Sequence, residues 1–393
     1  MKSTKKFAYS RLLALRGYWR RAWGNDVIYH PDTPSHLMLN PDKWLQFRSA
    51  ESIRRSAFIP DDFDSFDAWQ IIARERLAIL LGYSTPAMTW EEILPIQISK
   101  PTLKNGVLRD QIYLDGPDGR TIVISILRVD SPAAQDIRPA VIVLQGTNGG
   151  MHLSWGEIRG PADVYSLKDY PPMALGAIEK GFIAVCVEQF GAGERAFPGK
   201  SPQDGLATLA NKAMILGKTM LGIRVEDAVA VSQFLRTPYA LKYGIDPKNI
   251  SIAGHSSGGM TAIFAGALEC SFNAILCSGS LGSFQSTIMR RDIGNGQSVI
   301  PGFLSQFEMA DIVSLIAPRY CLIVSGDKDP IWPFEEAQSV TNEALKYFGP
   351  QAEKKLVCLK GIGRHQFYST LAWPTFAEMV QQDRQEKVAE YLY

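Results

Sequence analysis

The stretch "NISIAGHSSGGMTAIFAGAL" at residues 249–268 places two serines and a histidine between two apolar segments. β-Branched and apolar residues precede Gly254, and a long run of small and apolar residues follows Gly258. This order predicts a buried strand, a tight turn and a buried helix. The turn reads "GHSSG", with Ser256 at its centre, and is therefore a G-x-S-x-G motif in a strand–turn–helix context.

The position of Ser256 explains the two glycines. A serine on so sharp a turn is held in a strained backbone conformation, and a side chain at Gly254 or Gly258 would collide with the neighbouring strand or helix. The strain lifts the hydroxyl to the edge of the sheet where its strands end, which is where open α/β sheets bind ligands. The helix that follows directs its first backbone N–H groups toward developing negative charge. The turn therefore predicts a nucleophilic serine.

A serine hydroxyl is a poor nucleophile at neutral pH and needs a base that a third group holds in the right tautomer. In the order typical of such elbows, the acid and then the histidine follow the serine in the chain. Only His365, in "KGIGRHQF", follows Ser256. The other four histidines precede it: His30, His36, His152 and His255. His365 is therefore the predicted base.

The predicted acid follows the strand-like run "CLIVSG" at 321–326. The next residues, "DKDPIWP", offer Asp327 and Asp329. A loop beyond the strand end gives Asp329 the reach toward His365, so Asp329 is preferred and Asp327 is the alternative.

The oxyanion formed during acyl transfer needs hydrogen-bond donors. The backbone N–H of Ser257 supplies one, because this residue directly follows the nucleophile. The second is expected in the glycine-rich turn "QGTNGG" at 145–150, with the N–H of Thr147 preferred and that of Asn148 next.

The chain around the elbow alternates strand-like and helical patterns. "LDGPDGR" at 114–120 has the Asp-Gly chemistry of a hairpin, so the first two strands are expected to be antiparallel. Helices are expected at 206–236, 257–269 and 334–348. Apolar strands are expected at 120–129, 140–146, 182–190, 250–254, 274–280, 320–327 and 354–361. The fold class is therefore α/β, with a mostly parallel central sheet flanked by helices.

Residues 1–105 differ from the rest of the chain. They hold five of the eight tryptophans, and "SFDAWQIIARERLAILLGY" at 65–83 has apolar residues at helical spacing. We expect a mainly helical N-terminal region over 1–105, acting as a cap or a dimer surface, and a catalytic domain over 106–393. The first 23 residues are basic and are expected to form a solvated helix, with membrane-surface or subunit contact as alternatives.

Composition excludes several classes of protein. The 41 Lys and Arg nearly balance the 40 Asp and Glu, so the chain has no large positive charge that would attract a nucleic acid. Nucleic acid is therefore not an expected partner. The sequence contains no apolar run of about 18 residues, so no membrane-spanning helix is expected. The N-terminus lacks the pattern of a signal peptide. A small-molecule substrate is the expected partner, and a homodimer is left open.

The five cysteines are odd in number and show no C-x-x-C spacing, so they are interpreted as buried thiols in a reducing, cytoplasmic compartment. No cofactor and no metal are expected. "GAGERA" at 191–196 matches a dinucleotide-binding pattern, but a proline- and glycine-rich loop follows it, so no helix N-terminus is available for a pyrophosphate.

Residues that follow the motifs are candidates for the substrate pocket. Trp332 and Phe334 follow the acid, Met151 and His152 follow the oxyanion loop, and Phe190 ends a strand at the same sheet edge. All five are candidates to line a mainly apolar cavity, with burial in the core as the alternative.

Residues 108–393 resemble the α/β-hydrolase-fold serine hydrolases, particularly the dienelactone hydrolase and acetyl xylan esterase-like group. The resemblance rests on "GHSSGG", on "MADIVSLIAPRYCLIVSGDKDPIWP" at 309–333 and on "GRHQF" at 363–367. It implies that Ser256, Asp329 and His365 form a catalytic triad.

Two departures limit what the resemblance implies. Many relatives have His-Gly where this chain has Gln145-Gly146, which leaves the second oxyanion donor open. Dienelactone hydrolases proper use a cysteine where this chain has Ser256, which favours ester or amide-like chemistry resembling that of the esterases. The predicted function is hydrolysis of a carboxylic ester through an acyl-enzyme. A carbon–carbon bond hydrolase, an acyltransferase and a non-catalytic binding module are the alternatives.

Overall fold

The computed structural model divides the chain into two units, Met1–Arg48 and Ser49–Tyr393. Helix α2 (Pro41–Ala50) begins in the first unit and ends in the second. This division falls at a different place from the predicted boundary at residue 105. The structure describes residues 38–86, 96–100, 103, 106–129, 137–147, 149–291 and 296–390.

One nine-stranded sheet crosses the described part of the second unit, in the order β1-β2-β3-β5-β4-β6-β7-β8-β9. The pairs from β1 to β5 are antiparallel, and the pairs from β5 through β4 to β9 are parallel. The strands are β1 Ile96–Lys100, β2 Val107–Asp115, β3 Thr121–Val129, β4 Arg138–Leu144, β5 Ile183–Val187, β6 Ile245–His255, β7 Ala274–Ser278, β8 Tyr320–Gly326 and β9 Leu356–Gly361. The predicted hairpin is confirmed between β2 and β3, and so is the mostly parallel sheet.

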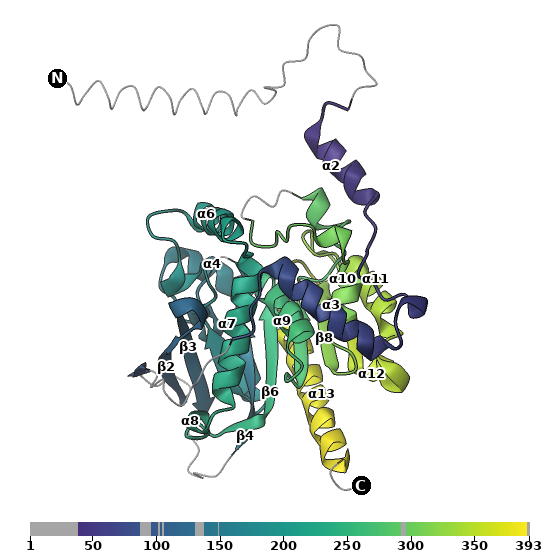
Figure 1. Ribbon diagram of the computed structural model, residues 1–393. Coiled ribbons are helices and arrows are strands. Elements are labelled where there is room, and N and C mark those ends of the chain that lie inside the picture. The colour runs from purple at the N-terminus through teal and green to yellow at the C-terminus, as the bar shows by residue number, and fades with distance from the viewer. Residues whose placement is uncertain are drawn as a thin grey trace, which may run out of the picture. The chain divides into compact units, whose positions relative to one another are not determined.

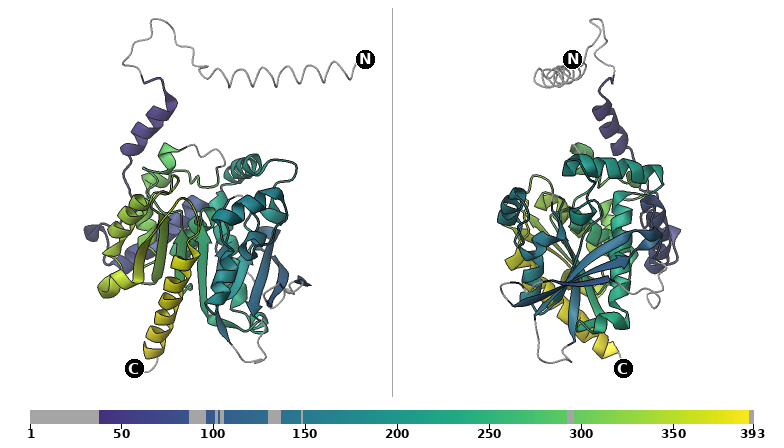
Figure 2. Two further views of the ribbon diagram at one scale, coloured as in Figure 1. Left: turned by 180° about the vertical axis from the view of Figure 1, so that it is seen from behind. Right: turned by 90° about the vertical axis from the view of Figure 1, so that its left-hand side faces the viewer.

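Helices cover both faces of this sheet (Figure 1). Helices α3, α7 and α9 pack together on one face, and α5 and α13 pack on the other, where Figure 2 shows α13 in front when the molecule is seen from behind. The helices of this unit are α3 Phe66–Leu81, α4 Pro161–Asp169, α5 Met173–Glu179, α6 Pro202–Ile215, α7 Met220–Leu235, α8 Pro238–Leu241, α9 Ser257–Leu268, α10 Met309–Ser314, α11 Phe334–Leu345, α12 Ala352–Lys355 and α13 Ser369–Glu390.

The central strands β5 and β7 are buried along their whole length, and so is β4 from Ala140 to Leu144, because helices cover both faces of the sheet there. In β4, Ile142 and Leu144 pack into the core beneath α7 and α9, while Val141 and Val143 pack into the core beneath α5 and α13. This alternation follows from the two-residue period of a strand. At about 25 cal/mol per Å² of buried apolar surface, burial on two faces stabilises the sheet strongly. The sheet is therefore a rigid base for the loops at its edge.

The prediction of one helix over 206–236 is corrected by the structure. The segment forms α6 and α7, and Gly217, with φ of 72°, lies between them in the left-handed region that ends helices. Thr219 then caps α7 by accepting a hydrogen bond from the N–H of Gly222.

Helix α3 belongs to the same unit as the sheet. The N–H of Thr219 donates to the carbonyl of Leu81, and Arg74 donates to the carbonyls of Ala267 and Leu315. None of the described residues before Gln145 lines the pocket that contains Ser256 and His365. The cap and dimer-surface roles of the N-terminal region therefore stay predictions.

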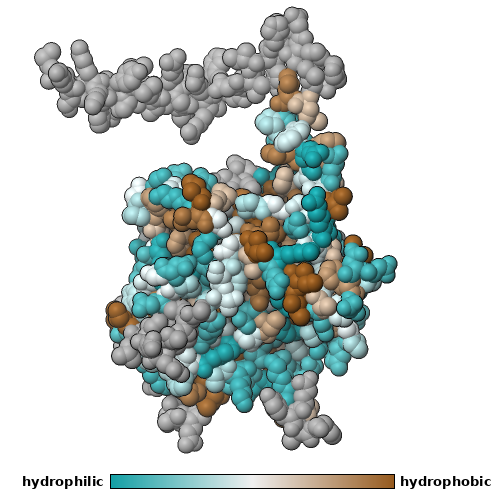
Figure 3. Space-filling model, in the orientation of Figure 1, coloured by the Kyte–Doolittle hydropathy of each residue, from teal (hydrophilic) through white to brown (hydrophobic). Residues whose placement is uncertain are grey.

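The surface carries exposed apolar side chains on α3 and at the end of α6, namely Ile79, Ile215 and Leu216. Figure 3 shows hydrophobic atoms among hydrophilic ones on the face that carries α3. None of the described helices is long and apolar enough to cross a membrane.

All five cysteines are free. Cys186, Cys277 and Cys321 are buried as expected, Cys358 is half-buried, and Cys270 is exposed, which corrects the expectation of five buried thiols. The cytoplasmic location stays a prediction.

Candidate active site

Ser256 lies between the end of β6 and the start of α9, with φ of 53° and ψ of −122°. Positive φ is strained for a residue with a Cβ, so the surrounding structure must hold it. The two flanking glycines permit this. A Cβ at Gly254 would lie 2.1 Å from the carbonyl oxygen of Gly258, and one at Gly258 would lie 2.2 Å from that of Leu144. The sequence thus folds into the sharp elbow that the motif predicts.

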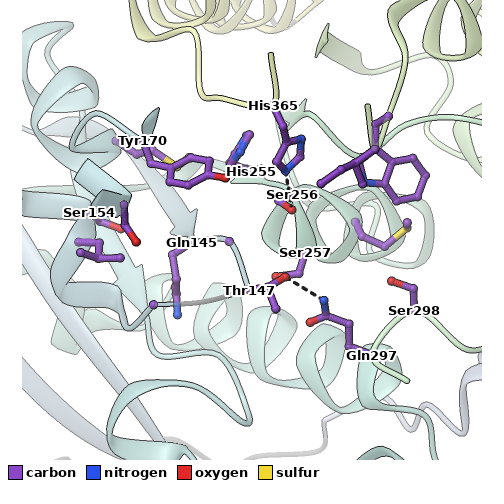
Figure 4. Close-up of a pocket in the computed structure, with 18 of the residues that line it drawn as sticks. Gln145, Thr147, Ser154, Tyr170, His255, Ser256, Ser257, Gln297, Ser298 and His365 are labelled. Carbon is purple, nitrogen blue, oxygen red and sulfur yellow. Dashed lines mark hydrogen bonds between the residues drawn. The ribbon is translucent and has the colours of Figure 1, made fainter. Parts of the chain in front are cut away.

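The structure brings His365 between Ser256 and Asp329. His365 Nε2 lies 3.0 Å from Ser256 Oγ, and His365 Nδ1 lies 2.7 Å from Asp329 Oδ2 (Figure 4 shows the first contact). Since the carboxylate can only accept, Nδ1 donates to it, and Nε2 of the neutral ring is left to accept the serine proton. The three side chains therefore have the geometry of a general-base relay.

The side chain of Asp329 is held by the backbone of the loop that follows it. It is 4% exposed, and its Oδ1 accepts hydrogen bonds from the N–H groups of Ile331 and Trp332 at 2.8 and 2.9 Å. These bonds fix the carboxylate so that Oδ2 faces the imidazole. The preferred acid is thus the one that meets His365.

Asp327 holds the histidine loop instead. Its Oδ1 accepts from the N–H of Gly363 at 2.8 Å, and the N–H of Lys328 donates to the carbonyl of Gly363. The side chain of Asp327, the alternative acid, therefore binds the backbone of Gly363, two residues before His365, and not the imidazole.

The two candidate oxyanion residues both line the pocket beside Ser256. Ser257 is the first residue of α9, so its N–H has no carbonyl partner within the helix. Thr147 lies in the turn after β4, and its Oγ1 accepts from Gln297 Nε2 at 2.8 Å (Figure 4). Asn148, the alternative donor, lies outside the described residues.

A buried polar network supports the turn that carries Thr147. Glu188, directly after β5, accepts from the N–H of Met151 at 2.8 Å and from Gln145 Nε2 at 3.2 Å. Gln189 Nε2 donates to the carbonyl of Gln145, and Gln189 Oε1 accepts from Thr261 of α9. The network therefore ties the oxyanion turn to the helix that follows the nucleophile.

Glu188 is fully buried, and this burial raises its pKa to about 7. Two backbone N–H groups, those of Met151 and Glu194, oppose the shift by stabilising the charge. The side chain therefore changes charge near neutral pH while it holds the turn.

His255, next to the nucleophile, is an unexpected part of the site. Its ring centroid lies 4.9 Å from that of His365 and 5.0 Å from that of Tyr170. Burial and the neighbouring His365 lower the pKa of His255 well below its usual range. It therefore stays neutral and covers one side of the catalytic ring.

The pocket has a cavity of about 290 Å³ and includes Ser256 and His365 in its wall. Tyr170 and Ser154 lie on one side of Ser256 in Figure 4, and Gln297 and Ser298 lie on the other. Sequence reasoning missed these four residues, which follow no motif. Further lining residues that it missed are Leu153, Ser166, Met173, Gln203, Met260, Arg291 and Ile331.

Of the five predicted pocket residues, only Trp332 lines this cavity. The expectation for the other four is corrected. Met151 is fully buried in the core, and His152 Nε2 lies 3.1 Å from Asp163 Oδ2. Phe190 packs against Leu206 and Met220 from α6 and α7. Phe334 is buried at the start of α11, with the ammonium of Lys360 over its ring.

Among the described residues, no group of three or more His, Cys, Asp or Glu side chains is arranged to hold a metal ion.

Comparison with known proteins identifies the family of this chain. The family model of the Abhydrolase family matches residues 54–333, about seven-tenths of the chain. The protein belongs to the Abhydrolase family. The matched range contains the elbow and Asp329 and ends before His365.

This Abhydrolase family member is similar to "Putative hydrolase YtaP" of Bacillus subtilis (strain 168), with 22% identity over 262 residues, which cover 60% of this chain and 84% of that protein. Its fold is similar to that of "a putative acetyl xylan esterase" from Bacteroides fragilis, with a TM-score of 0.64 and 19% identity over 86% of this chain and 84% of the other. It is also similar to a glucuronoyl esterase from Solibacter usitatus, with a TM-score of 0.57 and 13% identity over 84% and 97%. The α/β-hydrolase fold is thus confirmed.

Proposed function

We propose that the protein is a serine esterase that cleaves a carboxylic ester of a small or medium organic substrate. The observation that carries this proposal is the pair of contacts that joins Ser256, His365 and Asp329, at 3.0 and 2.7 Å. A serine in a strained elbow, a histidine within hydrogen-bond reach and a buried carboxylate behind it are the elements of nucleophilic acyl transfer. The names of the similar structures, among them acetyl xylan and glucuronoyl esterases, support ester chemistry.

In the proposed first step, His365 Nε2 removes the proton from Ser256 Oγ as the oxygen attacks the ester carbonyl. Asp329 stabilises the imidazolium that forms, and the N–H groups of Ser257 and Thr147 stabilise the oxyanion. The imidazolium then protonates the leaving alcohol, and an acyl-enzyme remains on Ser256. Water attacks this ester by the same route, and the acid is released.

The cavity supports a substrate of modest size. A volume of about 290 Å³ lies near the lower end of small-molecule sites. Its wall mixes apolar side chains such as Leu153 and Ile331 with hydroxyl and amide groups such as Ser298 and Gln203. We infer that a short acyl group and a polar alcohol fit this wall better than a long-chain lipid.

Turnover of 4-nitrophenyl acetate and butyrate by the purified protein tests the proposal. We expect hydrolysis of at least the acetate, and Ser256→Ala should lower kcat by about 10⁴-fold or more with little change in thermal stability. Ser271→Ala, at an exposed serine outside the pocket, is the matched control and should keep full activity. If Ser256→Ala and Ser271→Ala hydrolyse the acetate equally well, the proposal is wrong.

A further inference from the structure

Arg291 is the one Lys or Arg side chain among the described residues that line the pocket. No Asp or Glu is among those lining residues. The other described residues of the pocket wall are uncharged side chains and two histidines. Arg291 therefore supplies the permanent positive charge of this wall.

The side chain of Arg291 is held in place. Its guanidinium carbon lies 4.5 Å from the centroid of the Trp332 ring, and its Nε donates to the carbonyl of Thr287 at 3.4 Å. Trp332 lines the same pocket, and its N–H binds the catalytic acid candidate Asp329. A guanidinium stacked on an aromatic ring keeps the edges of its N–H fork available for an acceptor.

The charge of Arg291 is poorly compensated by the described residues. Burial lowers the pKa of the guanidinium, and the charge of Asp329 opposes this shift. The carboxylate oxygens of Asp329 are already engaged by His365, Ile331 and Trp332. A partly desolvated cation in a wall without carboxylates is stabilised by an anionic ligand.

We propose that Arg291 forms an anion subsite, and that the natural substrate is an ester that also carries a free carboxylate. The inference rests on the proposed esterase function and narrows its substrate class. A carboxylate matches the planar donor fork of arginine, and such charge-assisted hydrogen bonds are among the strongest that proteins form. A neutral ester of the same shape would leave the guanidinium without this partner.

The competing explanation is that Arg291 only packs on Trp332. Stacking of this kind stabilises an aromatic ring whatever the substrate is. A purely structural arginine would therefore affect charged and neutral substrates by the same factor. The ratio of their kcat/KM values separates the two explanations.

The experiment uses two pairs of rigid esters whose members have nearly the same shape, one with a carboxylate and the other with a neutral amide. The first pair, 4-acetoxybenzoate and 4-acetoxybenzamide, places the charge on the leaving group. The second, the 4-nitrophenyl esters of 4-carboxybenzoic and 4-carbamoylbenzoic acid, places it on the acyl group. In each pair the para position keeps the carboxylate from attacking its own ester.

Each pair is measured with the wild-type protein, with Arg291→Gln and with Arg290→Gln. Arg290 is exposed and lies in the same turn without lining the pocket, so it is the matched control. We expect the wild type to prefer the carboxylate in at least one pair. Arg291→Gln should lower that ratio of kcat/KM about 10- to 100-fold, as the loss of a charged hydrogen bond does. Arg290→Gln should leave the ratio unchanged.

Three results would overturn the inference. The wild type could show no preference for the carboxylate in either pair, or Arg291→Gln could lower kcat/KM for both members by the same factor. In either case 4-nitrophenyl acetate is still hydrolysed, so the esterase proposal survives. If the wild type hydrolyses neither that ester nor any member of the pairs, the esterase proposal fails and the anion subsite falls with it.

Discussion

Two buried carboxylates stand on opposite sides of the candidate nucleophile, Asp329 beyond β8 and Glu188 beyond β5. Each accepts hydrogen bonds from two backbone N–H groups. Asp329 then faces the imidazole of His365, whereas Glu188 faces the side-chain amide of Gln145. The first arrangement can stabilise a positive charge that forms during the reaction, and the second can only hold a turn. Both carboxylates are buried, so burial does not distinguish them. The comparison teaches that the side chain facing a buried carboxylate decides whether the carboxylate can take part in catalysis.

The largest expected difference between the two carboxylates lies in catalysis. Asp329→Asn should lower kcat for 4-nitrophenyl acetate by about 10³- to 10⁴-fold, because an amide favours the wrong tautomer of His365 and cannot stabilise the imidazolium. Steady-state kinetics at pH 8 measures it. If Glu188→Gln costs as much as Asp329→Asn, the distinction between the two carboxylates is wrong.

Glu188→Gln should have a smaller effect, a fall in kcat of about 10-fold. The turn that carries Thr147 loses a charged acceptor, and a less ordered oxyanion donor loses part of the two to three orders of magnitude that such a donor contributes. Gln145 Oε1 is buried and has no hydrogen-bond partner among the described residues, so rotation of the Gln145 amide can accommodate the new donor. Equal kcat values for the variant and the wild type would show that the network does not position the turn.

The two carboxylates also differ in how they link stability to pH. The pKa of Glu188 is raised to about 7 from an ordinary value of 4.5, so the folded protein retains a proton that the unfolded chain has lost. The stability that this proton confers is fully present below pH 4.5 and is lost as the pH rises through 7. Thermal unfolding of Glu188→Gln and the wild type should therefore diverge by a few degrees between pH 5 and pH 8, with the variant relatively more stable at pH 8.

His255 titrates in the opposite sense, and the comparison of variant with wild type removes its contribution. The pKa of this buried histidine is lowered, so its neutral form stabilises the fold above pH 6.5 and that stability is lost at lower pH. Both proteins carry His255. A constant difference in Tm across the pH range would contradict the assignment of the raised pKa to Glu188.

Asp327 should show the smallest effect on catalysis. It holds the backbone of Gly363 and does not touch His365, so Asp327→Asn keeps the acceptor oxygen and should lower kcat only about 2- to 5-fold. Kinetics under the same conditions as for Asp329→Asn gives the matched comparison. A loss near 10³-fold would mean that Asp327, not Asp329, is the acid that acts on His365.

The sequence carried much of this arrangement because the elbow constrains its surroundings. Glycine is required on both sides of Ser256, and only one histidine follows it, so the order of the chain left His365 as the one candidate. The choice between Asp327 and Asp329 needed the loop geometry, since both residues follow the same strand. Adjacency to a motif was a poor guide to the pocket, because neighbouring residues such as Met151 and Phe334 point into the core.

Residues that line the pocket from elsewhere left no signal of their own. Tyr170 directly follows α4, and Arg291 lies in the irregular segment after β7, so neither position belongs to a periodic pattern. Helix α3 shows the same limit inside a regular element. Ile72 is apolar and follows Trp69 at helical spacing, yet it is 39% exposed, and the polar Gln70 is buried because its amide binds the carbonyls of Ser314 and Ala317. Tertiary hydrogen bonds, which cannot be read from the sequence, therefore determine which side of α3 is buried.

Reaction of the protein with a fluorophosphonate, followed by mass spectrometry of its peptides, tests the central claim most directly. The account predicts one adduct, on Ser256, and a labelling rate that falls by at least about 10³-fold in His365→Ala because the serine loses its base. Ser271→Ala should be labelled like the wild type. An adduct on another serine, or no adduct on a folded protein, would contradict the assignment of Ser256 as the nucleophile.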